Sequence, residues 1–293
     1  MRSFAKLSYV LVFGIAITLI TFGAVLAQEG VHWSYEGDTG PDHWGALSPD
    51  FAACANGVEQ SPIDIPASAP LNPADVTFTY RPSAVNLVNN GHTIQANYDP
   101  GSSITLNGVT YDLIQFHFHA ASEHAIAGQH DPMEIHFVHR NAQGGLAVVG
   151  VLLKSGGANA AYAPVLQNLP PQASQPASVA GAIVDANQLL PVQRSYWRYN
   201  GSLTTPPCTE GVKWLVMNTP VEVSDAQIAA FTTIFKNNER PVQPFNARTF
   251  LMPTTLPRTG DGVVMLDGAL VGAGVLVIVA GLALAYVSRR KAA

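Results

Sequence analysis

Three of the 9 histidines in this 293-residue chain lie in one 18-residue stretch, YDLIQFHFHAASEHAIAG, at residues 111–128. The composition of this stretch predicts a β-strand followed by its exit loop. Because side chains alternate across a strand, Gln115, His117 and His119 share one face, and the intervening phenylalanines take the other. Two imidazoles therefore stand side by side on a polar face of the expected sheet.

A second histidine-bearing segment, MEIHFVHR, covers residues 133–140. The same alternation places Glu134, His136 and Val138 together on one face. His139 then points to the opposite side. If the two segments are near neighbours in one sheet, the three imidazoles on their polar faces can converge on one point.

Three neutral imidazoles, from His117, His119 and His136, with a fourth position open to water, are typical of a catalytic zinc site. A structural zinc site would use four protein ligands, usually thiolates. Metal-bound histidines also need an acceptor for the second ring nitrogen, and Gln115 and Glu134 each lie two residues from a ligand on the required face. The pattern predicts a Zn2+ cofactor.

Two other interpretations of these histidines compete with a zinc site. Strand histidines can be ordinary core residues, although burying several on one face without a metal costs desolvation for each. His117-x-His119 followed by Glu123 also resembles the first half of the cupin metal motif, in which the glutamate is a ligand. A second cupin motif bearing glycine, proline and a further histidine is absent from the sequence, and the third histidine comes from MEIHFVH.

The elements that must position these residues are mostly short β-segments within a single domain. We find no repeat and no long hydrophilic linker between residues 28 and 255. Asn107-Gly108 predicts a hairpin turn, because both residues tolerate positive φ, and Pro-rich loops are expected at 66–73 and 164–176. The expected strand segments are 76–80, 86–98, 103–119, 133–140, 146–154 and 211–223.

One helix is clearly predicted, and the fold class is therefore mainly β with a few short helices. Ser224 can cap the helix, with Gln227 three residues later as in a capping box. Ile228, Phe231 and Phe235 recur on one face, as expected for a surface helix packed on a sheet.

Both ends of the chain differ from the middle. Residues 1–27 combine Arg2 and Lys6 with a long apolar run ending in AVLA, which predicts a cleaved export signal. The alternative is an uncleaved N-terminal membrane anchor, because the apolar run is long for a signal.

At the C-terminus, residues 268–287 carry no charge and are long enough to cross a membrane. The basic tail at 288–293 would stay in the cytoplasm. The preceding motif LPRTG at 256–260 resembles the cell-wall sorting signal that sortases cut. We therefore expect an exported protein held at the cell surface, with sortase as a possible partner; the alternative is a plain transmembrane anchor.

Charge excludes one class of function. Without residues 1–27 and 260–293, 10 of the 15 Lys and Arg and 18 of the 20 Asp and Glu remain, so this part is formally 8 negative. Such a balance repels phosphate backbones, and nucleic-acid binding is not expected.

The chain has 2 cysteines, Cys54 and Cys208, whose spacing matches no zinc motif. In an exported protein a disulfide between them is favoured over two free thiols or a metal pair. Closing so long a loop would contribute roughly 4–5 kcal/mol in a chain-entropy account.

A set of longer motifs points to one family. In order along the chain, the motifs are HWSYEG, HWGAL, EQSPIDI, NNGH, LIQFHFH, SEH, MEIHFVH, LAVVG and YWRYNGSLTTPPCTEGVKW. Their order and approximate spacing resemble the alpha-class carbonic anhydrases over about residues 31–252. The resemblance implies one large, twisted, mostly antiparallel sheet with peripheral helices and a zinc site in a conical cleft.

The resemblance also implies residue roles. The three histidines already singled out would bind zinc, and His92 would be a proton shuttle. Thr204 would accept a hydrogen bond from the zinc-bound hydroxide and donate its own proton to Glu123. The bridge between Cys54 and Cys208 would resemble the disulfide of exported bacterial members and would brace the loop that carries Thr204.

Further positions follow from the same resemblance. An apolar pocket for carbon dioxide and a polar side with ordered water near the shuttle are implied. Gln95 departs from the family, where many members have Asn. The pocket residues would be Val138, Val148, Leu203, Thr204, Thr205 and Trp214, and the proton network Tyr35, Asn90 and Gln95.

The activity implied is zinc-dependent, reversible hydration of carbon dioxide to bicarbonate and a proton, an enzyme function. The alternative is a catalytically silent surface-binding module on the same fold. Silent relatives typically lose a zinc histidine, and none is lost in this sequence.

Overall fold

The computed structural model describes residues 31–72, 75–174 and 176–252. The chain divides into two units, Met1–His32 and Trp33–Ala293, and every described strand and helix belongs to the second unit. The predicted signal peptide, sorting motif, membrane span and basic tail lie outside the described residues. Within those residues, no helix is both long and apolar enough to span a membrane.

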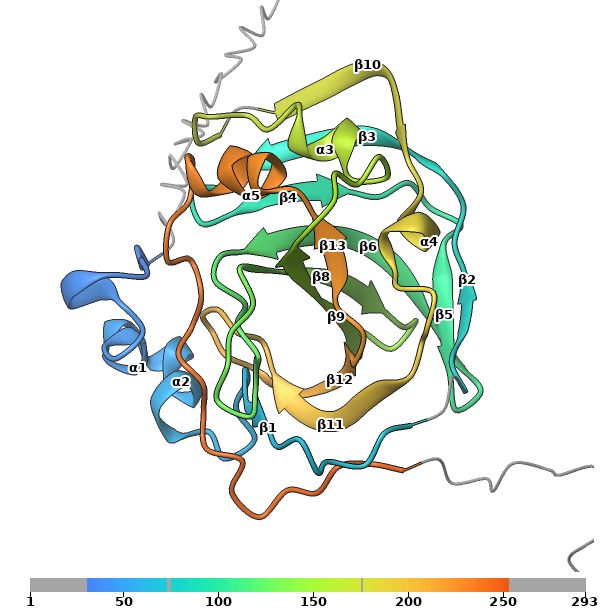
Figure 1. The fold of residues 1–293 in the computed structure, drawn as a ribbon. Helices are drawn as coiled ribbons and strands as arrows, with labels where there is room; N and C mark the ends of the chain where they lie inside the picture. Colours follow the sequence, from blue (N-terminus) through green and yellow to red (C-terminus); the bar gives the residue numbers. More distant parts are fainter. Residues whose placement is uncertain (1–30, 73–74, 175, 253–293) are drawn as a thin grey trace, which may run out of the picture. The chain divides into compact units, whose positions relative to one another are not determined.

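A sheet of 11 strands forms the centre of this unit (Figure 1). Its main path runs β10-β3-β4-β6-β8-β9-β12-β11, with β5 beside β6, β2 beside β5 and β13 beside β9. These strands are β2 (Thr77–Thr79), β3 (Ser83–Asn89), β4 (Ile94–Asn97), β5 (Ser103–Leu106), β6 (Val109–His119), β8 (Met133–Arg140), β9 (Leu146–Ser155), β10 (Pro176–Val184), β11 (Tyr196–Ser202), β12 (Glu210–Met217) and β13 (Val221–Val223).

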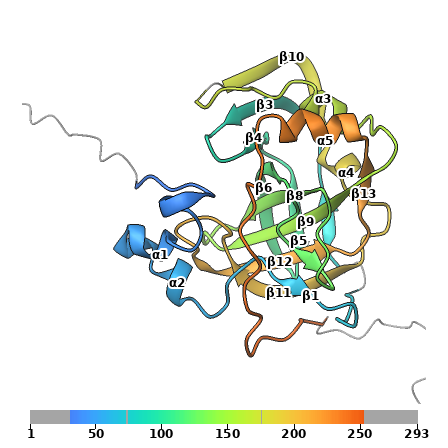
Figure 2. The ribbon, with the colours of Figure 1, turned by 60° about the vertical axis from the view of Figure 1, so that its left-hand side comes forward.

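Short helices and a two-stranded sheet surround the large sheet. In both views α1 and α2 lie apart from α3 and α5, and α3 contacts α5, β3 and β10 (Figure 2). The small sheet pairs β1 (Asp64–Ile65) with β7 (Ala125–Ile126). The helices are η1 (Gly37–Thr39), α1 (Trp44–Leu47), η2 (Pro49–Phe51), α2 (Ala53–Asn56), α3 (Ala163–Leu166), α4 (Ala186–Leu189) and α5 (Asp225–Thr232).

The predicted fold class is confirmed. Most pairings in the large sheet are antiparallel, but β9 pairs parallel with both β12 and β13, so the sheet is mixed. A parallel pair needs a long connection between its strands, and residues 156–209 supply it between β9 and β12. The Asn107-Gly108 turn is also as predicted, with φ of 51° and 77°.

β10, β11 and α3 are among the elements that were not predicted from the sequence. β10 (Pro176–Val184) is rich in Ala and carries a Gly, and its alternating exposure is that of a sheet edge. Because β10 has few β-branched side chains, its composition gives little indication of a strand. β11 lies within the motif YWRYNGSLTTPPCTEGVKW but outside the expected strand segments, and α3 occupies the start of the loop expected at 164–176.

Helix α5 follows its prediction closely. The Ser224 side chain accepts from the Gln227 backbone, and the Gln227 side chain accepts from the Ser224 backbone, which completes the capping box. Phe231 is buried, and Ile228 and Phe235 pack against the same core. Phe235 lies just beyond the helix, which ends at Thr232.

The large sheet buries an apolar cluster on each of its faces. Alternation along β6 sends Phe116 and Phe118 into the larger cluster, and β8 adds Ile135 and Phe137 to it. The smaller cluster, on the opposite side, includes Val148, Trp214 and Tyr199. The predicted histidine face lies on this second side. The opposite face of the same two strands, β6 and β8, is packed into the larger cluster through its aromatic side chains.

Candidate active site

Three histidine side chains meet where β6 and β8 pair. His117 lies directly opposite His136 in the antiparallel register, and His119 is two residues further along β6. The ring centroids are 5.0 Å apart for His117 and His119, 5.3 Å for His117 and His136, and 4.6 Å for His119 and His136. One ring nitrogen of each lies within 4.8 Å of the others. The convergence expected from strand alternation is therefore present.

The outer nitrogen of each ring donates a hydrogen bond to an oxygen. His117 Nδ1 donates to Gln115 Oε1 at 2.9 Å, and His136 Nε2 donates to Glu134 Oε1 at 2.9 Å. These two contacts match the sequence prediction. Three tethers of this kind fix the rings, and the remaining nitrogens, Nε2 of the two β6 histidines and Nδ1 of His136, face one another.

The third tether could not be read from the local sequence. His119 Nδ1 donates at 2.8 Å to the backbone carbonyl of Asn238, which follows α5 and is 119 residues away in the chain. His119 Nε2 is fully buried and has no hydrogen-bond partner among the described residues. A buried polar atom without a partner is costly, unless a ligand such as a metal ion satisfies it.

The electrostatics of the rings suit metal binding. Burial, and then the neighbouring His119 and His136, lower the pKa of His117 well below its ordinary value. Burial likewise lowers the pKa of His119, although Glu123 opposes it. These two imidazoles are therefore neutral near pH 7 and carry a lone pair for a metal.

Glu134 is the charged group behind the third ring. Although burial alone would raise its pKa, the charges and hydrogen bonds of His124 and His136 hold the pKa of Glu134 well below its ordinary range. Burial opposes protonation of His136, but the Glu134 carboxylate raises the pKa of His136. Glu134 is thus ionised and makes His136 a stronger electron donor.

A buried chain of hydrogen bonds continues behind Glu134. The carboxylate also accepts from the backbone N–H and Nδ1 of His124, both at 2.8 Å. His124 Nε2 accepts at 2.7 Å from Tyr199 Oη, which lies 2.9 Å from Ser61 Oγ. Burial raises the pKa of Tyr199 well above its ordinary value, so its hydroxyl remains a donor. Both ring nitrogens of His124 are therefore hydrogen-bonded, one to Glu134 and the other to Tyr199.

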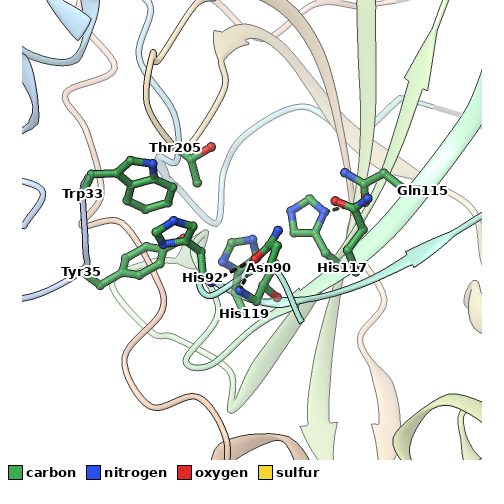
Figure 3. A pocket seen from close by; sticks show the side chains of 10 residues that line it. Trp33, Tyr35, Asn90, His92, Gln115, His117, His119 and Thr205 are labelled. Atoms are coloured by element: carbon green, nitrogen blue, oxygen red, sulfur yellow. Dashed lines mark hydrogen bonds between the residues drawn. The ribbon is translucent and has the colours of Figure 1, made fainter. Parts of the chain in front are cut away.

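The cleft beside the histidines has a polar half. A pocket of about 130 Å³ lies against His117 and His119 (Figure 3). His92 lies at its far side from Gln115, stacked on Trp33 with centroids 3.6 Å apart and ring planes 6° apart. The remaining side chains that line this half are Tyr35, Asn90, Thr93, Gln95 and Thr205.

Two of the predicted proton-network residues organise this polar half. Asn90 Oδ1 accepts from the backbone N–H groups of His92 and Thr93, both at 2.9 Å, and so closes the turn that presents His92. Gln95 Nε2 donates at 2.7 Å to Asn97 Oδ1, which directs the side-chain amide along the strand.

The other half of the cleft is apolar. A second pocket, of about 120 Å³, shares Gln115, His117 and Thr205 with the first. Its remaining lining residues are His136, Val138, Val148, Leu203, Thr204 and Trp214. All the residues that the sequence assigned to a substrate pocket are therefore present in this wall.

Glu123 and Thr204 lie close to the rings. Arg240 donates its backbone N–H to Glu123 Oε1 at 2.9 Å. The other carboxylate oxygen, Oε2, is buried without a hydrogen-bond partner among the described residues and lies 3.6 Å from His119 Nε2. Thr204 is 6% exposed. The described contacts hold no hydrogen bond between Thr204 and Glu123, so their predicted pairing stays a prediction.

The predicted disulfide is present and lies beside the cleft. Cys54 and Cys208 are joined, with Cα atoms 5.0 Å apart, across 154 residues of sequence. Cys208 N donates to Thr205 O at 2.8 Å. The bridge therefore ties the loop that carries Thr204 and Thr205 to the helix α2 region.

Similar known proteins share one family description. A family model described as eukaryotic-type carbonic anhydrase matches residues 39–252. A carbonic anhydrase of Pectobacterium carotovorum is 41% identical over 238 residues, which are 81% of this chain and 97% of the relative. One from Nostoc sp. is 45% identical over 223 residues, 74% of this chain and 84% of the relative.

A solved structure shows the same fold. The alpha-carbonic anhydrase of Thermovibrio ammonificans, in complex with the inhibitor sulfanilamide, superposes with a TM-score of 0.73 at 43% identity. The match covers 76% of this chain and 100% of that one.

Proposed function

The chain belongs to the eukaryotic-type carbonic anhydrase family, and we propose that it catalyses the reversible hydration of carbon dioxide to bicarbonate and a proton with a zinc ion. One observation carries the proposal: three tethered imidazoles turn their free nitrogens towards one point, and one of these nitrogens is buried without a partner among the described residues. Three nitrogen donors beside an open pocket are the donor set of catalytic zinc.

His117, His119 and His136 would hold the metal. When bound, zinc supplies a strong Lewis acid and lowers the pKa of a coordinated water to about 7. The low pKa values of the first two rings make them neutral ligands at that pH. Ionised Glu134 fixes the ring of His136 and offsets part of the positive charge.

The apolar half of the cleft would hold the substrate. Carbon dioxide carries no charge and is weakly hydrated, so a wall of Val138, Val148, Leu203 and Trp214 can hold it beside the histidines without a charged clamp. The same wall excludes water that would compete for that place.

Thr204 and Glu123 would orient the nucleophile. The buried Oε2 of Glu123 is the acceptor that a nearby hydroxyl can use, because Oε1 already accepts from the Arg240 backbone. If Thr204 donates there, its hydroxyl lone pairs are left to accept a hydrogen bond from the attacking oxygen. This pairing would select one direction of attack on the carbon.

The polar half of the cleft would remove the proton. Hydration leaves one proton per bicarbonate, and it must reach bulk water before the next turnover. His92 is partly exposed and lines this half of the cleft, a position suited to a relay. Tyr35, Asn90 and Gln95 would hold the water that connects it to the histidine cluster.

We also propose that the enzyme is exported and kept at the cell surface. The disulfide supports an oxidising compartment. The signal peptide at 1–27, the sorting motif at 256–260 and the span at 268–287 remain predictions from the sequence. Cell fractionation with and without a sortase would decide between cell-wall attachment and a membrane anchor.

The experiment is to purify the full chain, measure its metal content by elemental analysis and follow carbon dioxide hydration by stopped-flow acidification. We expect about one zinc per chain and rapid hydration that a sulfonamide inhibits. Zinc without hydration would favour the silent binding module, and no zinc would contradict both.

A further inference from the structure

Asn238 is an extensively bonded polar residue beside the histidine cluster, and no sequence pattern points to it. It is 1% exposed and lies in the segment that follows α5. Its backbone and side chain together contact both strand β6 and the turn that carries His92. This inference rests on the proposed function, which assigns a role to His119 on β6 and to His92 in that turn but none to Asn238.

On one side, Asn238 brackets His119. Its backbone carbonyl accepts from the His119 ring at 2.8 Å. Its side chain accepts at 2.9 Å from the N–H of Ala120 and donates at 3.1 Å to the carbonyl of Phe118. One residue therefore holds the ring of His119 and the peptide groups before and after it.

On the other side, the same amide reaches the turn of His92. Asn238 Nδ2 donates to the backbone carbonyl of His92 at 3.1 Å. Thr93 Oγ1 donates at 2.6 Å to the Phe118 carbonyl, which the Asn238 amide also contacts. The His92 turn and the end of β6 are thus joined through a common buried amide.

We propose that Asn238 is a positioning residue that couples the orientation of the zinc ligand His119 to the placement of the proton relay His92. The amide of Asn238 has two donor hydrogens and one acceptor oxygen, and it faces two carbonyls and one N–H. No other side chain of this size offers that combination. The coupling therefore depends on the amide and not only on the buried volume.

The test replaces the amide by the isosteric carboxylate, Asn238→Asp, in the full chain. The acceptor towards Ala120 is kept, but an oxygen now faces the carbonyls of His92 and Phe118. We expect zinc affinity, measured by chelator competition, to fall about 10- to 100-fold. In the zinc-loaded variant we expect kcat to fall about tenfold and kcat/KM to change less than about twofold, because proton release follows bicarbonate formation.

Two comparisons make the result specific. Imidazole buffer should restore most of the lost kcat, since it replaces the relay, while the zinc affinity stays low. Asn237→Asp is the matched control, because Asn237 is exposed, adjacent and able to keep its φ of 54° as Asp. It introduces the same charge and should leave zinc affinity and kcat unchanged.

The inference is overturned if Asn238→Asp behaves like the wild type, or if it loses zinc affinity while kcat of the loaded form is unchanged or not rescued by imidazole. A wild type that binds no zinc would remove the proposed function as well, so the two failures are distinguishable.

A measurement on the wild type covers the case in which the variant does not fold. On adding zinc to the metal-free, ¹⁵N-labelled chain, the side-chain amide of Asn238 and the backbone signal of His92 should shift together with His119. The Asn237 side chain should not move. A response of His119 without Asn238 and His92 would overturn the coupling.

Discussion

Strand β8 carries a buried histidine on each of its two faces, and the two differ in their hydrogen-bond partners and in the direction in which their pKa is shifted. His136 and His139 are three residues apart and point to opposite sides of the sheet, and they are 1% and 0% exposed. His136 donates to the Glu134 carboxylate, which raises its pKa. His139 contacts the neutral Tyr80 hydroxyl at 2.7 Å and the Ala147 carbonyl at 3.3 Å, and burial lowers its pKa to about 3.

The difference shows that burial alone does not identify a functional histidine. Both ring nitrogens of His139 are used by neutral partners, so the ring is satisfied within the core. His136 has one nitrogen held by a carboxylate and the other turned towards two further imidazoles. The chemical nature of the partners, and a nitrogen turned towards other imidazoles, separate a candidate ligand from a structural residue.

The largest effect should come from removing a ring on the functional face. His119→Ala is expected to abolish both zinc binding and carbon dioxide hydration, because two imidazoles alone hold zinc weakly. His139→Ala is the matched change on the other face and should keep about one zinc per chain and the hydration rate, at a cost in stability. Loss of zinc from His139→Ala, or retention of zinc by His119→Ala, would contradict the assignment of the ligands to one face.

The core face should dominate stability. Phe137→Ala removes a fully buried ring from the larger apolar cluster and should lower the free energy of unfolding by about 3–5 kcal/mol. Val138→Ala, one residue along and on the cleft face, should cost less than about half of that because its side chain is only partly buried. Urea unfolding measures both, and equal costs would contradict the assignment of faces.

The buried His139 should impose a pH dependence on stability. In the unfolded chain its imidazole takes up a proton below about pH 6.5, whereas in the fold it does so only near pH 3. The unfolded state therefore binds more protons between these values, and stability falls as the pH falls. Between pH 7 and pH 5 this amounts to about 2 kcal/mol.

His139→Phe removes this titration. The other histidines are the same in the variant and the wild type, so their contributions to the pH dependence cancel in the comparison. The loss of stability between pH 7 and pH 5 should be about 2 kcal/mol smaller in the variant than in the wild type. Chemical unfolding at the two pH values measures it. An unchanged difference would mean that His139 is protonated in the fold.

The smallest effect should come from the relay. His92→Ala should lower kcat about tenfold, equivalent to about 1.4 kcal/mol, because buffer and water partly replace it. Zinc content and kcat/KM should stay near wild type. Stopped-flow hydration with increasing imidazole should recover the rate, and a loss that no buffer repairs would count against the relay.

Strand alternation was enough to predict which side chains share the functional face. Gln115, His117 and His119 lie on one face as expected, and so do the alternate residues of β8. In a strand, the alternation of side chains fixes which face each residue occupies. The capping box of α5 is equally local. Such features depend on residues a few positions apart, which a sequence displays directly.

The features that were missed depend on distant residues. Asn238 reaches His119 across 119 residues, and β9 pairs parallel with β12, from which it is separated by a long connection. Strand β10 lies at a sheet edge, and its Ala-rich sequence carries little strand propensity of its own. No periodic pattern in a single sequence encodes these contacts.

The central claim is that three imidazoles share one zinc ion, and zinc K-edge X-ray absorption on the zinc-loaded full chain tests it most directly. We predict only nitrogen and oxygen neighbours at about 2.0–2.1 Å, with outer-shell scattering of three imidazole rings. A sulfur neighbour at about 2.3 Å, or scattering from fewer than three imidazoles, would contradict the account.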